Sequence, residues 1–189
     1  MLHFTSHREK RLWIYALTAV VAVYATLGVA QALAAELRDR GLLGVVFGTG
    51  LALIVLSIVT QGLRARPRGI EIGVALGIAG VYLIAFARVF TPEHRSHLIE
   101  YSVVALLIHQ ALAERKEQAG RPRFPGLLGV GIAMCIGGVD ECIQWLLPNR
   151  VFDPFDLLFN FLAIVMAVAA NGTLGWVRRW RRSRGIKER

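Results

Sequence analysis

The sequence predicts an all-α membrane protein, a polytopic bundle of about six transmembrane helices with both termini in the cytoplasm. Hydrophobic residues make up 55% of the 189 positions, whereas a soluble domain is about 45–50% apolar. They gather in runs of about 20 residues, which at 1.5 Å per residue match the roughly 30 Å hydrocarbon core of a bilayer. Lys and Arg concentrate in every second connection between these runs. Most of the chain is therefore expected to lie in lipid.

Six apolar runs define the expected helices, and short polar connections separate them. The runs are Leu12–Ala34, Leu42–Leu63, Ile70–Phe90, Ser96–Ala113, Pro125–Leu147 and Pro154–Val177. The first resembles a secretory signal, but it exceeds the 7–15-residue apolar core of such signals, so we expect a retained helix. The chain is then one membrane domain over 1–189, with three N-terminal helices in 1–92 and a basic cytoplasmic tail at 178–189.

The basic residues predict the orientation of the chain. The formal net charge is +9. Seventeen of the 22 Lys and Arg residues lie at 8–11, 64–68, 115–123 and 178–189, which share one side of the membrane in a six-helix topology. Basic connections stay in the cytoplasm. Charge placed this way indicates contact with lipid headgroups and not with nucleic acid.

This topology brings the unusual polar residues of the last three runs to one depth near the outer surface. Spacings of three, four and seven residues place each set on one face of its helix. The predicted ligand-binding residues are His97, Glu100, Tyr101, Asp140, Glu141, Gln144, Arg150, Asp153, Asp156 and Asn160.

An ionised acid facing lipid costs at least about 2.5–3.5 kcal/mol. We therefore expect these acids to face one another across an inner cavity, with Arg150 and His97 as counter-charges. His109 is interpreted as a packed core histidine. Cys135 and Cys142 are interpreted as small apolar core residues, because about 10 Å of helix separates them and no disulfide can form.

Four short motifs carry a resemblance to VanZ-like membrane proteins. His97-Leu98-Ile99-Glu100-Tyr101 resembles the opening His-x-x-Glu-Tyr of that family, and Asp140-Glu141-Cys142-Ile143-Gln144 resembles its Asp-Glu-x-x-Gln. Pro148–Asp153 resembles its Pro-x-Arg-x-x-Asp loop, and Asp156 and Asn160 match the following Asp and Asn. The similar region covers 93–168, and the first three helices lie outside it.

The sequence departs from the family pattern at two places. Glu93, His94 and Arg95 stand where a Lys or similar residue often precedes the His, and Ala163 stands where a glycine often follows the Asn. The resemblance implies a multi-pass protein of the bacterial plasma membrane. The founding member of the family is associated with low-level resistance to the glycopeptide teicoplanin. The resemblance implies no particular reaction and no cofactor.

Three functions remain open from the sequence. The polar pocket can bind or handle a lipid-linked or cell-envelope ligand, or a glycopeptide, with Arg150 pairing with phosphate or carboxylate. Alternatively, Glu100, Asp140 and Glu141 can serve as catalytic acid and base, or join His97 around a divalent metal, in a hydrolase or transferase. The third alternative is a scaffold whose polar network locks the last three helices together.

Overall fold

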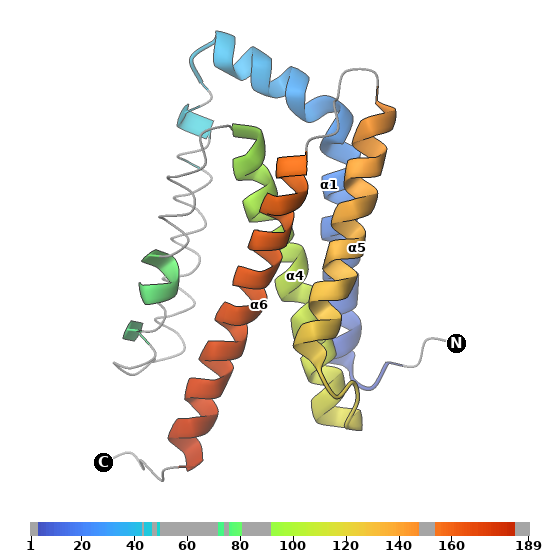
Figure 1. The fold of residues 1–189 in the computed structure, drawn as a ribbon, viewed down its shortest axis with the longest axis vertical. Helices are drawn as coiled ribbons and strands as arrows, with labels where there is room; N and C mark the ends of the chain where they lie inside the picture. The colour runs from blue at the N-terminus through green and yellow to red at the C-terminus, as the bar shows by residue number, and fades with distance from the viewer. Residues whose placement is uncertain are drawn as a thin grey trace.

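The computed structural model describes residues 4–42, 44–46, 49, 72–73, 76–80, 92–147 and 154–183 of the chain. Its long elements are α1 (His7–Asp39), α4 (Pro92–Ala119), α5 (Pro125–Leu146) and α6 (Pro154–Ser183), shown in Figure 1. No strand occurs among the described residues. The predicted all-α class is confirmed for this part of the chain.

Three of the helices are long and apolar enough to cross a membrane, namely His7–Leu27, Pro125–Leu146 and Phe155–Val177. They coincide with the first, fifth and sixth predicted runs. The second and third predicted runs lie almost wholly outside the described residues. Six spans and cytoplasmic termini therefore remain predictions.

The first helix begins at a cap that its sequence encodes. The Ser6 hydroxyl accepts a hydrogen bond from the backbone N–H of Glu9 at 3.0 Å. The Glu9 carboxylate in turn accepts bonds from the N–H and hydroxyl of Thr5, both at 2.7 Å. This reciprocal arrangement is a variant of the capping box and satisfies the first donors of the helix.

The same helix is longer than the expected span of Leu12–Ala34. Its 33 residues extend for about 50 Å, which exceeds the roughly 30 Å hydrocarbon core. Its last third leans away from the bundle axis across one end of the other helices (Figure 1). The helix stops at Gly41, whose φ of 67° favours glycine.

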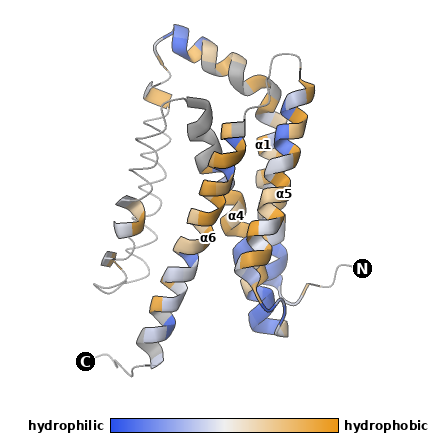
Figure 2. Ribbon diagram, viewed as in Figure 1, coloured by the Kyte–Doolittle hydropathy of each residue, from blue (hydrophilic) through white to orange (hydrophobic). Residues whose placement is uncertain are grey.

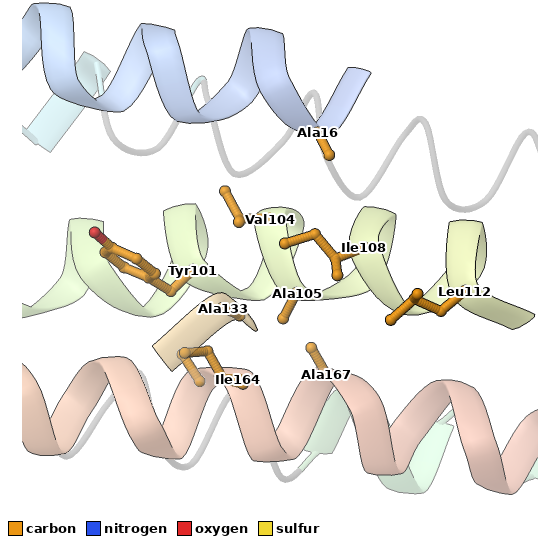
Figure 3. Close-up of a cluster of buried hydrophobic side chains, with 10 residues drawn as sticks. Ala16, Tyr101, Val104, Ala105, Ile108, Leu112, Ala133, Ile164 and Ala167 are labelled. Carbon is orange, nitrogen blue, oxygen red and sulfur yellow. The ribbon is translucent and has the colours of Figure 1, made fainter. Parts of the chain in front are cut away.

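The central helix of the described bundle is α4, which packs against α1, α5 and α6. Both of its ends carry charged residues, and it is not among the three described helices that are apolar enough to cross a membrane. One face of its middle is buried, and Val104, Ala105, Ile108 and Ala111 are at most 1% exposed. Val104, Ala105 and Ile108 belong to the apolar core, together with Ala16, Ala133, Ile164 and Ala167 (Figure 3).

A stripe of small residues lets α5 approach its neighbours closely. Gly126, Gly129, Ala133 and Gly137 follow at spacings of three and four, so they share one helix face. A Cβ atom on Gly129 would lie 3.5 Å from Cα of His109, and one on Gly137 would lie 3.4 Å from the Tyr101 ring. Small residues at such contacts permit the close packing on which helix association in lipid depends.

Two reciprocal ion pairs join the start of α1 to the end of α4. Arg8 Nη1 lies 3.1 Å from Oε2 of Glu114, and Arg115 Nε lies 3.6 Å from Oε1 of Glu9. Both carboxylates are buried. The two helices are therefore antiparallel, and α5 and α6 follow in alternating directions.

Basic residues collect where α1 and α5 begin and where α4 and α6 end, and we call this the basic end. Figure 2 shows hydrophilic residues gathered there on α1 and α4. The basic residues described at this end are Arg8, Lys10, Arg11, Arg115, Lys116, Arg121, Arg123 and Arg179. Three of the four segments predicted to be cytoplasmic, at 8–11, 115–123 and the start of 178–189, therefore lie at the same end of the bundle.

Replacing Gly129 with Leu should lower the stability of the bundle by about 1–3 kcal/mol, because the new side chain would collide with the backbone of His109. Thermal unfolding of the purified protein in detergent measures the effect. The matched control is Gly138→Leu on the same helix, since a Cβ atom there has no described neighbour within 4 Å. Equal melting temperatures for the two variants would contradict close packing at Gly129.

Candidate functional site

Six buried polar side chains from three helices converge toward the end of the bundle opposite the basic end. We call them the polar cluster: Tyr101 of α4, Asp140, Glu141 and Gln144 of α5, and Asp156 and Asn160 of α6. All six belong to the predicted site. Each is at most 6% exposed, so the structure encloses them in protein as the cost of polar groups in lipid requires.

The α5 members of the cluster lie in the last two turns of that helix. Asp140 and Gln144 are four residues apart and therefore share a face. The Gln144 Nε2 atom donates a hydrogen bond to Oδ2 of Asp140 at 3.2 Å. Glu141 is the next residue along and is only 1% exposed. The buried face of α5 thus changes from glycine and alanine to carboxyl and amide groups as the helix ends.

The α6 members reach the cluster from the first two turns of their helix. Asn160 is fully buried, and its Nδ2 atom donates a long hydrogen bond of 3.5 Å to Oε1 of Glu141. Asp156 lies one turn earlier on the same face and is 6% exposed. The hydrogen bond between Asn160 and Glu141 directly links α5 to α6.

Tyr101 is the contribution of α4. Its ring lies against Gly137, where a Cβ atom would be 3.4 Å from the ring. Its hydroxyl group lies beside the Asp140 carboxyl group. The hydroxyl of the next residue, Ser102, donates a 3.4 Å hydrogen bond to the Ala163 carbonyl of α6. Glu100 is half-buried at the same level of α4.

The structure does not describe the side chains of His97 and Arg150, the two predicted counter-charges of the site. His97 lies within α4, and only its backbone is described. Arg150 and Asp153 lie outside the described residues. Among the described residues, His109 is the one buried basic side chain, and it lies more than two turns from Tyr101 along α4.

His109 is a packed core histidine, as predicted. It is 9% exposed, its backbone lies against Gly129, and its Nδ1 atom is 2.8 Å from Nδ2 of Asn171. Asn171 was not among the predicted partners of this histidine. The sequence feature that could have predicted this contact is the spacing of eleven residues from Asn160 to Asn171. Eleven residues are about three helical turns, so both amides lie on the same face of α6.

The interpretation of the two cysteines as core residues is wrong. Cys135 and Cys142 are both exposed on the outer surface of α5. The polar and small residues of α5 occupy its inner face, so the intervening cysteines point outward. A thiol is apolar enough to face lipid, and an apolar residue in a membrane helix is therefore not evidence for burial.

The chemistry of the cluster favours a partner that donates hydrogen bonds. Its three carboxyl groups are acceptors when ionised, and the described donors within it are the amides of Gln144 and Asn160 and the phenol of Tyr101. The Asn160 Oδ1 atom is buried and accepts no hydrogen bond from the described residues. No group of three or more His, Cys, Asp or Glu side chains in the described part of the chain has the arrangement of a metal site.

The contact between α5 and α6 in the cluster is the hydrogen bond from Asn160 to Glu141. A double-mutant cycle between Glu141 and Asn160 tests this contact. Glu141→Met and Asn160→Leu should each lower the unfolding free energy by about 1–3 kcal/mol, because each leaves a buried polar partner unsatisfied.

The double variant should recover about 0.5–3 kcal/mol relative to the sum of the two. Unfolding in mixed detergent micelles gives the four free energies. The exposed Thr173 supplies the control, since Glu141→Met combined with Thr173→Val should be additive. An additive cycle for Glu141 and Asn160 would show that the two side chains do not interact.

Comparison with known proteins leaves this geometry as the basis for any functional assignment. No protein-family model matches the chain, and no curated protein or solved structure does so either.

Proposed function

We propose that this chain is a VanZ-like protein of the bacterial plasma membrane that binds the polar headgroup of a lipid-linked cell-envelope intermediate. The observation that carries the proposal is the convergence of Asp140, Glu141, Gln144, Asp156 and Asn160 in one buried cluster. Several polar residues that meet inside a membrane bundle mark a functional site by default, because each is costly there.

The distribution of charge supports an outward-facing site. The basic end carries the start of α1, the segment 115–123 and the end of α6. Basic segments remain on the cytoplasmic side during insertion. With the basic end in the cytoplasm, the polar cluster lies toward the outer leaflet, where envelope intermediates are used.

The residues of the cluster define what such a ligand must offer. Carboxyl oxygens and the Asn160 amide oxygen require donors, which the hydroxyl, amide and ammonium groups of a lipid-linked sugar or peptide supply. Arg150 precedes α6 in the sequence by four residues and would pair with the phosphate of the carrier lipid. A glycopeptide also presents amides, hydroxyl groups and an ammonium group, so tolerance to teicoplanin is a further expected phenotype.

A second function, that of a scaffold, is favoured by the hydrogen bonds within the cluster. Gln144 bonds to Asp140 within α5, and Asn160 bonds to Glu141 between α5 and α6. In that case the network would serve only to lock the three helices. The two functions differ in what the negative charge of Glu141 contributes.

Glu141→Gln separates the two functions, because it removes the charge and keeps the shape of the side chain. In nanodiscs, the wild-type protein should bind the polyprenyl-linked disaccharide-pentapeptide of the cell wall. The variant should bind it at least about tenfold more weakly, since a hydrogen bond to a charged group contributes roughly 1.5–3 kcal/mol. Microscale thermophoresis measures the binding, and thermal unfolding measures the stability.

The matched control is Glu117→Gln, which removes an exposed carboxylate of α4 at the basic end. It should bind like the wild type. Loss of stability in Glu141→Gln with unchanged binding would establish the scaffold. Absence of binding by the wild type would overturn the proposed function.

A further inference from the structure

A long apolar groove runs along a face of α5 that differs from the one carrying the polar cluster. Its volume is about 840 Å³, and α1 and the segment before α5 complete its walls. The residues used below are Tyr24 of α1, Arg123 and Phe124 before α5, and Leu128, Gly131 and Cys135 of α5. None of the six members of the polar cluster lines it.

A specific contact between helices shapes the groove. The Tyr24 hydroxyl donates a 2.7 Å hydrogen bond to the carbonyl oxygen of Ile136, which holds α1 against α5 along one wall. Gly131 faces the groove without a side chain, and a Cβ atom there would meet no described atom within 4 Å. Gly131 thus leaves space in the groove, and the Tyr24 hydrogen bond fixes one of its walls.

The dimensions of the groove suit an acyl chain. It extends from Phe124 to Val139, which at 1.5 Å per residue is about 22 Å. One leaflet contributes about half of the roughly 30 Å hydrocarbon core. A hydrocarbon chain entering at the basic end can therefore lie in the groove over the full depth of its leaflet.

The charges at the mouth of the groove determine the class of headgroup. Arg123 lines the mouth, with its guanidinium group 5.3 Å from the centre of the Phe124 ring. The Lys116 ammonium group donates a 3.0 Å hydrogen bond to the Arg123 carbonyl, so a second cation lies beside it. Arg121 is exposed two residues earlier, and Glu117 is the nearby acid. The excess of positive charge complements an anion.

We propose that the groove between α1 and α5 is a binding site for an anionic phospholipid. One acyl chain lies along Leu128, Gly131 and Cys135, and the phosphate-bearing headgroup contacts Arg123 and Lys116. Arginine and lysine bind phosphate oxygens through charge-assisted hydrogen bonds. The headgroup contacts lie at the basic end, and no member of the polar cluster lines the groove, so the site is independent of the proposed envelope ligand.

Lipid retention in native mass spectrometry tests the headgroup contact. The full chain is released from nanodiscs that contain equal amounts of dioleoyl phosphatidylglycerol and dioleoyl phosphatidylcholine. The wild type should retain phosphatidylglycerol preferentially. The double variant Lys116→Gln with Arg123→Gln should lose about fivefold of that preference for each cation removed.

A matched double variant, Lys10→Gln with Arg179→Gln, removes two exposed cations of the basic end outside the groove. It should keep the preference of the wild type. Equal losses in the two double variants would show general attraction to the basic end and overturn the site. Equal retention of the two lipids by the wild type would do the same.

The acyl-chain contact is tested without a change of charge. Gly131→Leu fills the groove and should abolish retention, whereas Gly138→Leu should not, because Gly138 lies about two turns further along α5 and does not line the groove. Inorganic phosphate distinguishes a lipid from a free anion. If phosphate at millimolar concentration displaces phosphatidylglycerol completely, the site recognises the anion alone and the groove has no role.

The native cysteines allow a test in the folded protein that needs no change at the groove. Cys135 lines the groove and Cys142 is exposed outside it. Bimane on Cys135, in a Cys142→Ser background, should be quenched more by brominated phosphatidylglycerol than by brominated phosphatidylcholine. Bimane on Cys142, in a Cys135→Ser background, should be quenched equally by both. Equal quenching at Cys135 would overturn the proposal.

Discussion

The enclosure of Asp140 and Glu141 within protein is the constraint on which the described bundle depends. A carboxyl group directed into lipid is costly, so α5 must be rotated until both side chains face α4 and α6. That rotation places Gly129 and Gly137 against His109 and Tyr101, where only small residues fit. It also turns the two cysteines outward and exposes the apolar face that forms the groove with α1.

The two ends of the bundle use charge in different ways. At the basic end, the ion pair between α1 and α4 joins the exposed side chain of Arg8 to the buried carboxylate of Glu114. At the opposite end, carboxyl groups are buried among amides and a phenol. Water and headgroups can screen the first arrangement, whereas the second lies in a medium where each hydrogen bond is stronger and each missing one is costlier.

The sequence predicted the features that follow from a single helix. Lengths of apolar runs gave α1, α5 and α6, and spacings of three and four gave the shared faces of Asp140 with Gln144 and Asp156 with Asn160. These features need no knowledge of the neighbouring helices, because the period of the α-helix alone determines them.

Features that depend on the contact between two helices were not predicted correctly from the sequence or remain predictions. The partner of His109 and the outward direction of Cys135 depend on which faces meet, and apolar residues suit protein and lipid equally well. The central position of α4 was not predicted, because its charged ends lower its hydropathy although one face of its middle is buried. The roles expected for His97 and Arg150 rest on side chains that lie outside the described part of the structure.

The ion pairs between α1 and α4 can form only after both helices have been synthesised. The Arg8 side chain must wait for Glu114, which is 106 residues further along the chain. At about 5–20 residues per second, ribosomal synthesis takes roughly 5–20 seconds to supply that partner. The hydrogen bonds from Thr5 to Glu9 span only four residues, so the cap of the first helix needs no partner from α4 to form.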